Sequence, residues 1–387
     1  MPQENKKKER VKKMIKFGKW VVKFRIPILI LSFLLLIPTG IIYMNTRINY
    51  DILSYLPGDI ETMKGQDILL DEFGTGAFSV AVIDGMQEKE ISQLEDKLKE
   101  IDHVKDVLWY GALADISIPM DMLPDDLKDS LQNADTGSQL MIITFDTSMS
   151  ADEILDAIEE IRGLTNEQCL LSGMSAVVTD IKKICNSEVI MYVVIAAGLS
   201  ALVLALTMDS FLLPFIFLLS IGMAIVYNLG TNFIAGEISF VTQALAAVLQ
   251  LAVTMDYSIF LWHSYLENQE RYPDDRKRAM SHAISQTLTS VVGSSITTIA
   301  GFLAMCFMTF TLGMDLGVVM AKGVVFGVIG CVTILPSMIL AMDKWIEKTR
   351  HKAIIPDLGR IGGFVTKHYK NRSTLFILCA FSCTAQN

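Results

Sequence analysis

Six long windows of the sequence carry almost no charge, whereas charged residues crowd the stretches between them. Each window reaches the roughly 20 residues that a helix needs to cross about 30 Å of hydrocarbon. The windows are Ile26–Thr46, Val189–Met208, Ser210–Gly236, Glu237–His263, Ala283–Met314 and Leu316–Met342. The sequence therefore predicts a polytopic α-helical membrane protein with six transmembrane helices. A seventh apolar run, Ser373–Asn387, begins as another span would.

Basic residues indicate which ends of the spans face the cytoplasm. Ten precede the first window, four follow the fourth and eight follow the sixth. The positive-inside rule places all three groups in the cytoplasm, so we expect a multi-pass cell-membrane protein with a cytoplasmic N-terminus. The same rule places the long stretch between the first two windows outside. Residues 6–25 also form the pattern of a basic amphipathic helix, with Met14, Phe17, Val21 and Phe24 on its apolar side. Such a helix either lies on an anionic inner leaflet or only sets the topology.

These features divide the chain into six parts. We expect a basic cytoplasmic amphipathic segment (1–25), a first span (26–46), an extracytoplasmic domain (47–188), spans two to six (189–342), a second basic cytoplasmic segment (343–372) and the truncated start of a seventh span (373–387).

The segment 47–188 is too long to be a connector, and it contains 29 acidic against 10 basic residues. An acidic surface of this kind does not attract nucleic acid, so we expect no nucleic-acid partner. Its pattern predicts two successive strand–helix–strand units, as in a ferredoxin-like α+β layer. The predicted elements are a helix at Thr62–Phe73, a strand at Ala77–Ile83, a helix at Glu88–Glu100, a strand at Val104–Trp109, a strand at Gln139–Phe145, a helix at Ala151–Arg162 and a strand at Gln168–Leu171.

The fourth window carries a carboxylate, Asp256, well inside an apolar run, and a phenol, Tyr257, beside it. An ionisable residue inside a membrane is costly, so it usually faces a bundle interior and serves a function. Burial disfavours the charged form of a carboxyl group, which can therefore load and release a proton as its exposure changes. We expect Asp256 and Tyr257 to form a proton relay.

Small polar residues on two neighbouring windows are candidates for lining this relay. On a helix, Gln243, Ala247, Gln250, Thr254 and Tyr257 share one face of the fourth span. The fifth span carries a second stripe of hydroxyl groups, formed by Ser290, Ser294, Thr297 and Thr298. Small hydroxyl-bearing faces allow close helix contact, so we expect these two stripes to pack together and to screen Asp256 from lipid.

Lys322 is the other charge inside a span. It lies far in depth from Asp256, so we expect it to extend to the outer interface, toward Asp315, and not to pair with Asp256. Gly323 and Gly327 form a GxxxG pattern that favours close helix contact.

Of the six cysteines, we expect Cys169 and Cys185 to be extracytoplasmic. The sequence neither requires nor excludes a disulfide bond between them. No CxxC or His-paired spacing accompanies them, and we expect apolar packing and no metal site.

The sequence lacks the motifs of common enzyme classes. It contains no Walker A loop, no GxSxG and no HExxH, so we expect no enzymatic activity and no cofactor. Without a nucleotide site, the energy for any transport must come from an ion gradient.

The chain repeats its own beginning near its end. A shift of 347 residues aligns Lys23 with Lys370 and Arg25 with Arg372, each pair followed by an apolar run. Transporters built from two structural repeats show this pattern. We therefore interpret the chain as the first half of a larger architecture, which functions with a second half or as a homo-oligomer.

At these residues the chain resembles the resistance-nodulation-division (RND) superfamily, and most closely the N-terminal half of its MMPL family. The resemblance rests on NYDILSYLPGD after the first span, LSGMSAVVTDI before the second, MDYSIFLWHSYLE in the fourth, SVVGSSITTIAGF in the fifth and VTILPSMIL in the sixth.

The resemblance implies a proton-motive-force-driven exporter of lipidic, hydrophobic or amphiphilic molecules. It also implies that the outer domain is a porter domain and that Asp256 and Tyr257 are half of the proton relay. Two alternatives remain: a SecD/SecF-like protein-export accessory, and a sterol-sensing-type lipid sensor that does not transport.

Overall fold

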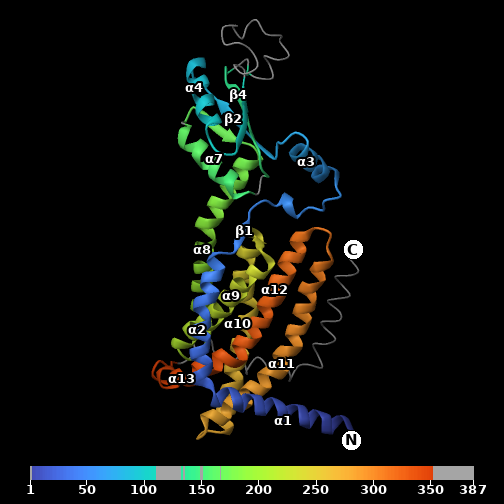
Figure 1. The fold of residues 1–387 in the computed structure, drawn as a ribbon. Helices are drawn as coiled ribbons and strands as arrows, with labels where there is room; N and C mark the ends of the chain where they lie inside the picture. The colour runs from blue at the N-terminus through green and yellow to red at the C-terminus, as the bar shows by residue number, and fades with distance from the viewer. Residues whose placement is uncertain (1, 110–131, 134–135, 149–150, 166, 352–387) are drawn as a thin grey trace, which may run out of the picture.

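The structure, a computed structural model, describes residues 2–109, 132–133, 136–148, 151–165 and 167–351 (Figure 1). In it an α+β region stands at one end of a helical bundle. Among the described residues, six helical segments are long and apolar enough to cross a membrane, and the α+β region is inserted between the first two. The chain is therefore a polytopic helical membrane protein, as the sequence predicts. The predicted run 373–387, the residues beyond 351 of the segment 343–372, Cys379 and Cys383 lie outside the described residues.

The bundle is built from the apolar windows of the sequence. Its helices are α2 (Arg25–Met44), α8 (Met174–Thr207), α9 (Leu212–Gly230), α10 (Phe240–Arg271), α11 (Arg276–Ala304), α12 (Thr311–Ile329) and α13 (Leu335–Lys348), with short 3₁₀ turns η3 (Thr231–Ala235) and η4 (Met305–Phe307). The sixth span is interrupted by a π-helical turn, η5 (Gly330–Ile334), which divides it into α12 and α13. Such turns inside helices frequently mark functional sites.

The α+β region contains a four-stranded antiparallel sheet with the order β3-β4-β2-β5. Its elements are β2 (Ala77–Ile83), α4 (Glu88–Lys99), β3 (Val104–Leu108), β4 (Gln139–Phe145), α7 (Asp152–Leu164) and β5 (Cys169–Ser172), preceded by η1 (Leu53–Tyr55) and α3 (Glu61–Asp71). In each strand–helix–strand unit the two strands are separated by a strand of the other unit. This is the split βαβ arrangement of the ferredoxin-like fold, so the predicted fold class is confirmed.

The core of this region lies between the sheet and the two helices that connect its strands. Along β2, buried and more accessible residues alternate, as a strand with one covered face requires. Ile91 of α4 and Ile158 of α7 are fully buried against this covered face. Cys169 is buried there with a free thiol, and Cys185 on α8 is also a free thiol, so the disulfide that the sequence left open is absent.

Helix α8 joins the α+β region to the bundle without a break (Figure 1). It begins after Gly173, whose φ of +101° suits glycine and whose added Cβ would lie 3.0 Å from Ser79 Cα in β2. Arg162 of α7 donates two hydrogen bonds to Asp180 of α8, at 2.7 and 2.9 Å. Because both helices are tied together, the region and the second span form one connected unit.

Helix α1 (Pro2–Lys23) crosses the end of the bundle opposite the α+β region (Figure 1). Of the predicted apolar side, Val21 is fully buried and Phe17 packs partly against the bundle core. Phe24 is 38% exposed, and Val22 is buried instead. The predicted apolar side therefore docks partly on helices of the bundle, whereas Phe24 follows the end of α1 at Lys23 and remains accessible.

Candidate functional site

Helix α10 carries the candidate proton site. Its first turn follows Ser239, whose side-chain oxygen accepts a hydrogen bond from the backbone N–H of Val241 at 3.2 Å. This N-cap fixes where the helix starts. From there α10 runs to Arg271, and Asp256 lies near its middle.

The two sides of α10 differ sharply in burial. Gln250, Thr254 and Tyr257 are buried, with exposed fractions of 1%, 2% and 6%. Ala252 and Asp256 are exposed. Asp256 therefore lies on the surface of the described chain, and the expectation that neighbouring helices screen it is wrong for this chain.

The hydroxyl stripe of α11 is also accessible. Ser290, Ser294 and Thr297 are exposed, and Thr298 is half-buried. Thr297 and Thr298 donate their hydroxyl hydrogens to the backbone oxygen of Ser294, at 2.7 and 3.2 Å. These two hydroxyl groups are thus bonded within their own helix and do not reach α10.

Glycines of α12 explain why the predicted stripe-to-stripe packing is wrong. A Cβ on Gly323 would lie 2.9 Å from Gln250 Oε1, and one on Gly327 would lie 1.9 Å from Thr254 Cγ2. The polar stripe of α10 therefore packs against α12, and the predicted GxxxG contact is present. Asn228 of α9 completes this contact by donating to Gln250 Oε1 at 3.0 Å.

The α10–α11 pair nevertheless brings Asp256 and the α11 stripe to the same depth. Ser264 and Asn268 of α10 both donate to Gln286 Oε1 of α11, each at 2.6 Å. The two helices run antiparallel, so eight residues before Ser264 and eight after Gln286 lead to Asp256 and Ser294 at matching depth. We call Ala252, Asp256, Ser290, Ser294 and Thr297 the Asp256 surface.

A cavity of about 530 Å³ lies at the bundle end nearest the α+β region. Lys322 lines it and donates a hydrogen bond to Asn232 Oδ1 of η3. Asp315 lines it too, and its Oδ2 accepts from the Ser239 N–H at 2.9 Å and from the Thr242 hydroxyl at 2.6 Å. Lys322 thus reaches the expected end of the bundle, where its hydrogen-bond partner is Asn232 and not Asp315.

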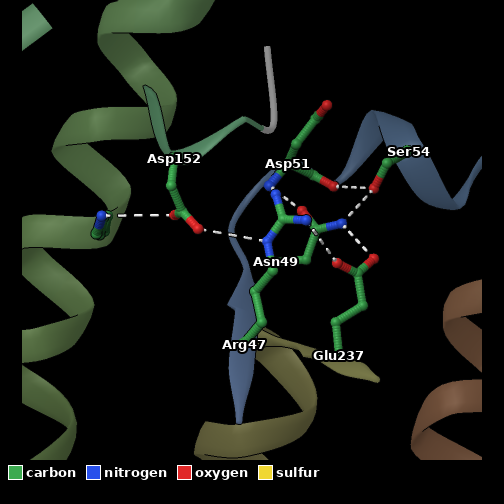
Figure 2. A network of polar contacts seen from close by, with 7 residues as sticks. Arg47, Asn49, Asp51, Ser54, Asp152 and Glu237 are labelled. Carbon is green, nitrogen blue, oxygen red and sulfur yellow. Dashed lines mark hydrogen bonds and ion pairs between the residues drawn. The ribbon is translucent and has the colours of Figure 1, made fainter. Parts of the chain in front are cut away.

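A polar network joins the α+β region to the start of α10 (Figure 2). Strand β1 (Arg47–Asn49) follows α2 and pairs in parallel with β6 (Glu237–Ser239), which leads directly into α10. Asn49 donates to Ser54 Oγ at 2.9 Å and to Glu237 Oε1 at 3.0 Å. We call this network the junction.

Arg47 extends the junction into the α+β region (Figure 2). Its guanidinium group lies 3.6 Å from Glu237 Oε2 and 3.5 Å from Asp152 Oδ2, at the first residue of α7. Asp51 is buried beside it, and its Oδ1 accepts from the Leu53 N–H at 2.9 Å. Burial is the main cause that raises the pKa of Asp51 above its ordinary value.

The sequence model of the MMPL family matches residues 74–367 of this chain. The chain belongs to the MMPL family. This places it in the RND superfamily, as the sequence motifs indicate.

Relatives of this MMPL chain include membrane and transport proteins of bacteria. The membrane protein SCO5905 of Streptomyces coelicolor is 25% identical over 59% of this chain and 28% of its own length. The Probable transport protein MmpL12 of Mycobacterium tuberculosis is 23% identical over 73% of this chain and 24% of its own length. The chain thus spans about a quarter of the length of these relatives.

Solved structures of SecDF are similar over 84% of the MMPL chain. One, in a super-membrane-facing form, has a TM-score of 0.44 at 13% identity and is covered over 39% of its length. Another, from Thermus thermophilus, has a TM-score of 0.46 at 14% identity and is covered over 38% of its length.

The sequence pattern identifies Asp256 in this MMPL chain but does not identify Asn228 and Asn232, which bond to Gln250 and Lys322. Asn228 and Asn232 lie one helical turn apart, and no local pattern marks them as neighbours of Gln250 and Lys322. A signal was available in the GxxxG pattern, because glycines on one helix indicate that a neighbouring helix approaches there.

Proposed function

We propose that this chain is part of a proton-driven exporter of lipidic, hydrophobic or amphiphilic molecules. Family membership and a relative named as a transport protein support a transport role. The observation that carries the proposal is Asp256, an exposed carboxylate near the middle of α10, a helix long and apolar enough to cross a membrane. In the membrane, residues 47–188 face outward and α1 faces the cytoplasm, as the distribution of basic residues predicts.

The exposure of Asp256 favours a partner that covers it in the membrane. A carboxylate that faces lipid costs at least a few kcal/mol, and such groups are almost always covered by protein or water. Covering the Asp256 surface with a second transporter half, or with a second copy of this chain, would remove this cost. The exposed hydroxyl groups of Ser290 and Ser294 at the same depth then supply polar contacts to the partner.

Asp256 and Tyr257 have different positions in the proposed relay. Asp256 carries the proton, because it reaches the surface where a partner and water meet it. Tyr257 is buried about 100° away around the helix, and its backbone oxygen accepts from the Cys331 thiol at 3.3 Å. We propose that Tyr257 holds α10 in the rotation that directs Asp256 outward. When that rotation changes, the phenol of Tyr257 takes part in the relay.

The junction offers a route from the relay to the porter domain. Protonation of Asp256 changes the free-energy cost of exposing this side of α10 to lipid. The change favours a different position of the helix in the bundle. Because α10 begins at β6, its movement acts on β1 by backbone pairing and on α7 through Arg47 and Asp152. A proton at Asp256 thereby acts on the domain that moves the substrate.

Efflux from vesicles tests the proposal. The complete transporter, reconstituted with a fluorescent amphiphile inside, is given an imposed pH gradient, and release is followed over time. We expect release that stops when a protonophore collapses the gradient, and a loss of at least tenfold in Asp256→Asn. Lipid binding without gradient-dependent release would contradict export and favour the lipid-sensor alternative. Gradient-dependent release that Asp256→Asn leaves unchanged would contradict the relay.

A further inference from the structure

Helix α1 is docked on the bundle and does not lie free at its surface. A Cβ on Gly18 would lie 2.3 Å from the backbone oxygen of Ser281 in α11, so glycine is needed for this approach. Val21 and Val22 are buried beside it, at 0% and 5% exposure. The basic residues of α1 are therefore held at fixed places relative to the start of α11.

A cavity of about 560 Å³ lies between α1 and the first turn of α11. Five cationic side chains line it, together with one carboxylate. The lining residues are Lys19, Val22, Lys23, Arg25, Asp275, Lys277, Arg278 and Ser281. Five positive charges and one negative charge leave a formal net charge of +4, and we call this site the basic cavity.

The cations of the basic cavity have no acidic partner within the described part of the chain. Among the described residues, none of these five side chains forms an ion pair. The neighbouring Arg276 instead bonds to Asp343 and lies 3.0 Å from Glu347. Asp275 uses its Oδ1 to accept the Arg278 N–H at 2.9 Å, which caps α11. Within the described residues, the cavity therefore has an excess of positive charge that an anion from outside the protein can balance.

The surroundings of the basic cavity indicate an amphiphilic anion. Trp20 of α1 and Phe24, which lies between α1 and α2, are 50% and 38% exposed next to the cationic residues. Aromatic residues at the ends of spanning helices sit at the level of lipid headgroups. Lys23 lies over the Phe24 ring at 5.4 Å, so charge and apolar surface meet at one place.

We propose that the basic cavity binds the phosphate headgroup of an anionic phospholipid, whose acyl chains lie beside Trp20 and Phe24. Lys and Arg side chains contact the phosphate oxygens, and the cavity selects for net negative charge. The bound lipid fixes α1 to α11 by bridging cations of both helices. This site is separate from the Asp256 surface and does not depend on the proposed transport activity.

Lipid binding to the purified chain tests the proposal. Native mass spectrometry from detergent gives the apparent Kd of dioleoylphosphatidylglycerol and of dioleoylphosphatidylcholine for each variant. We expect wild type to prefer phosphatidylglycerol. The double variant Lys23→Gln/Arg278→Gln, which removes one cation from each helix, should weaken phosphatidylglycerol binding roughly 20-fold.

Two matched variants separate a charged site from a structural effect. Lys12→Gln/Lys13→Gln removes two exposed cations of α1 outside the cavity, and it should keep the wild-type preference. Lys23→Arg/Arg278→Lys conserves the charge and should also keep the preference for phosphatidylglycerol. Equal weakening by all three variants, or equal binding of both lipids by wild type, would overturn the proposal. Displacement of phosphatidylglycerol by an equal concentration of inorganic phosphate would show a soluble-anion site instead.

Discussion

At the scale of single residues, Gly230 controls how closely α2 approaches α9. A Cβ at this position would lie 2.3 Å from the backbone oxygen of Thr39. We expect Gly230→Ala to separate the two helices and to destabilise the bundle by about 1–3 kcal/mol. Gly222, in the same helix, has nothing within 4 Å of an added Cβ, so Gly222→Ala is the matched control. Thermal unfolding in detergent measures the effect. Equal unfolding temperatures of the two variants would contradict the close approach of α2 and α9 at Gly230.

Cys169 illustrates how burial determines reactivity. Its side chain lies in the core of the α+β region, and burial raises the pKa of its thiol above the ordinary value. Less thiolate forms at a given pH, and a reagent cannot reach it. We expect Cys169 in the folded protein to resist maleimide at pH 8 and to react after denaturation, as mass spectrometry of the modified peptide would show. Rapid native labelling would contradict the packing described.

Asp256 shows the limit of sequence reasoning at this scale. A lone carboxylate in an apolar window identifies the residue, because such a group is rare inside a membrane. The direction in which the Asp256 side chain points, however, depends on how α10 is rotated in the bundle. That rotation follows from the close approach of Gly323 and Gly327 to Gln250 and Thr254, which pairs residues far apart in sequence.

At the scale of secondary-structure elements, the junction depends on Asn49. This buried side chain donates two hydrogen bonds and accepts a third from the Asp51 N–H at 2.9 Å. Asn49→Ala leaves that buried N–H without its partner and should cost roughly 1–3 kcal/mol. Asn45→Ala, at an exposed position just before β1, should change stability little. Hydrogen exchange of β1 and β6 reports the effect, and equal exchange in both variants would count against the junction.

Elements with a local pattern were predictable, whereas those defined by distant pairing were not. The sequence predicts β2 and β4 at their observed bounds, because each is a short apolar run with turn-forming residues on both sides. Strands β1 and β6 have three residues each and pair across 190 positions, so nothing local identifies them. The π-helical turn within the sixth span was also missed, since the apolar window continues through it.

At the scale of the whole molecule, we expect a partner to cover the Asp256 surface. A spin label at Ala252→Cys, on the exposed side of α10, should be shielded from oxygen and lipid in the assembled transporter. A label at Val194→Cys, which is 63% exposed on α8, should stay accessible and serves as the control. Equal accessibility at both positions in the assembled protein would contradict the proposed partner.

Proton uptake during transport is the direct test of Asp256 as the proton site. Vesicles that contain the complete transporter and a pH-sensitive dye report proton movement when substrate is added. Asp256→Asn should abolish substrate-dependent proton uptake. Glu267→Gln should keep it, because Glu267 is an exposed carboxylate of the same helix that pairs with Arg271 outside the apolar run. Full proton uptake by Asp256→Asn, or an equal loss in Glu267→Gln, would contradict the assignment of the proton site to Asp256.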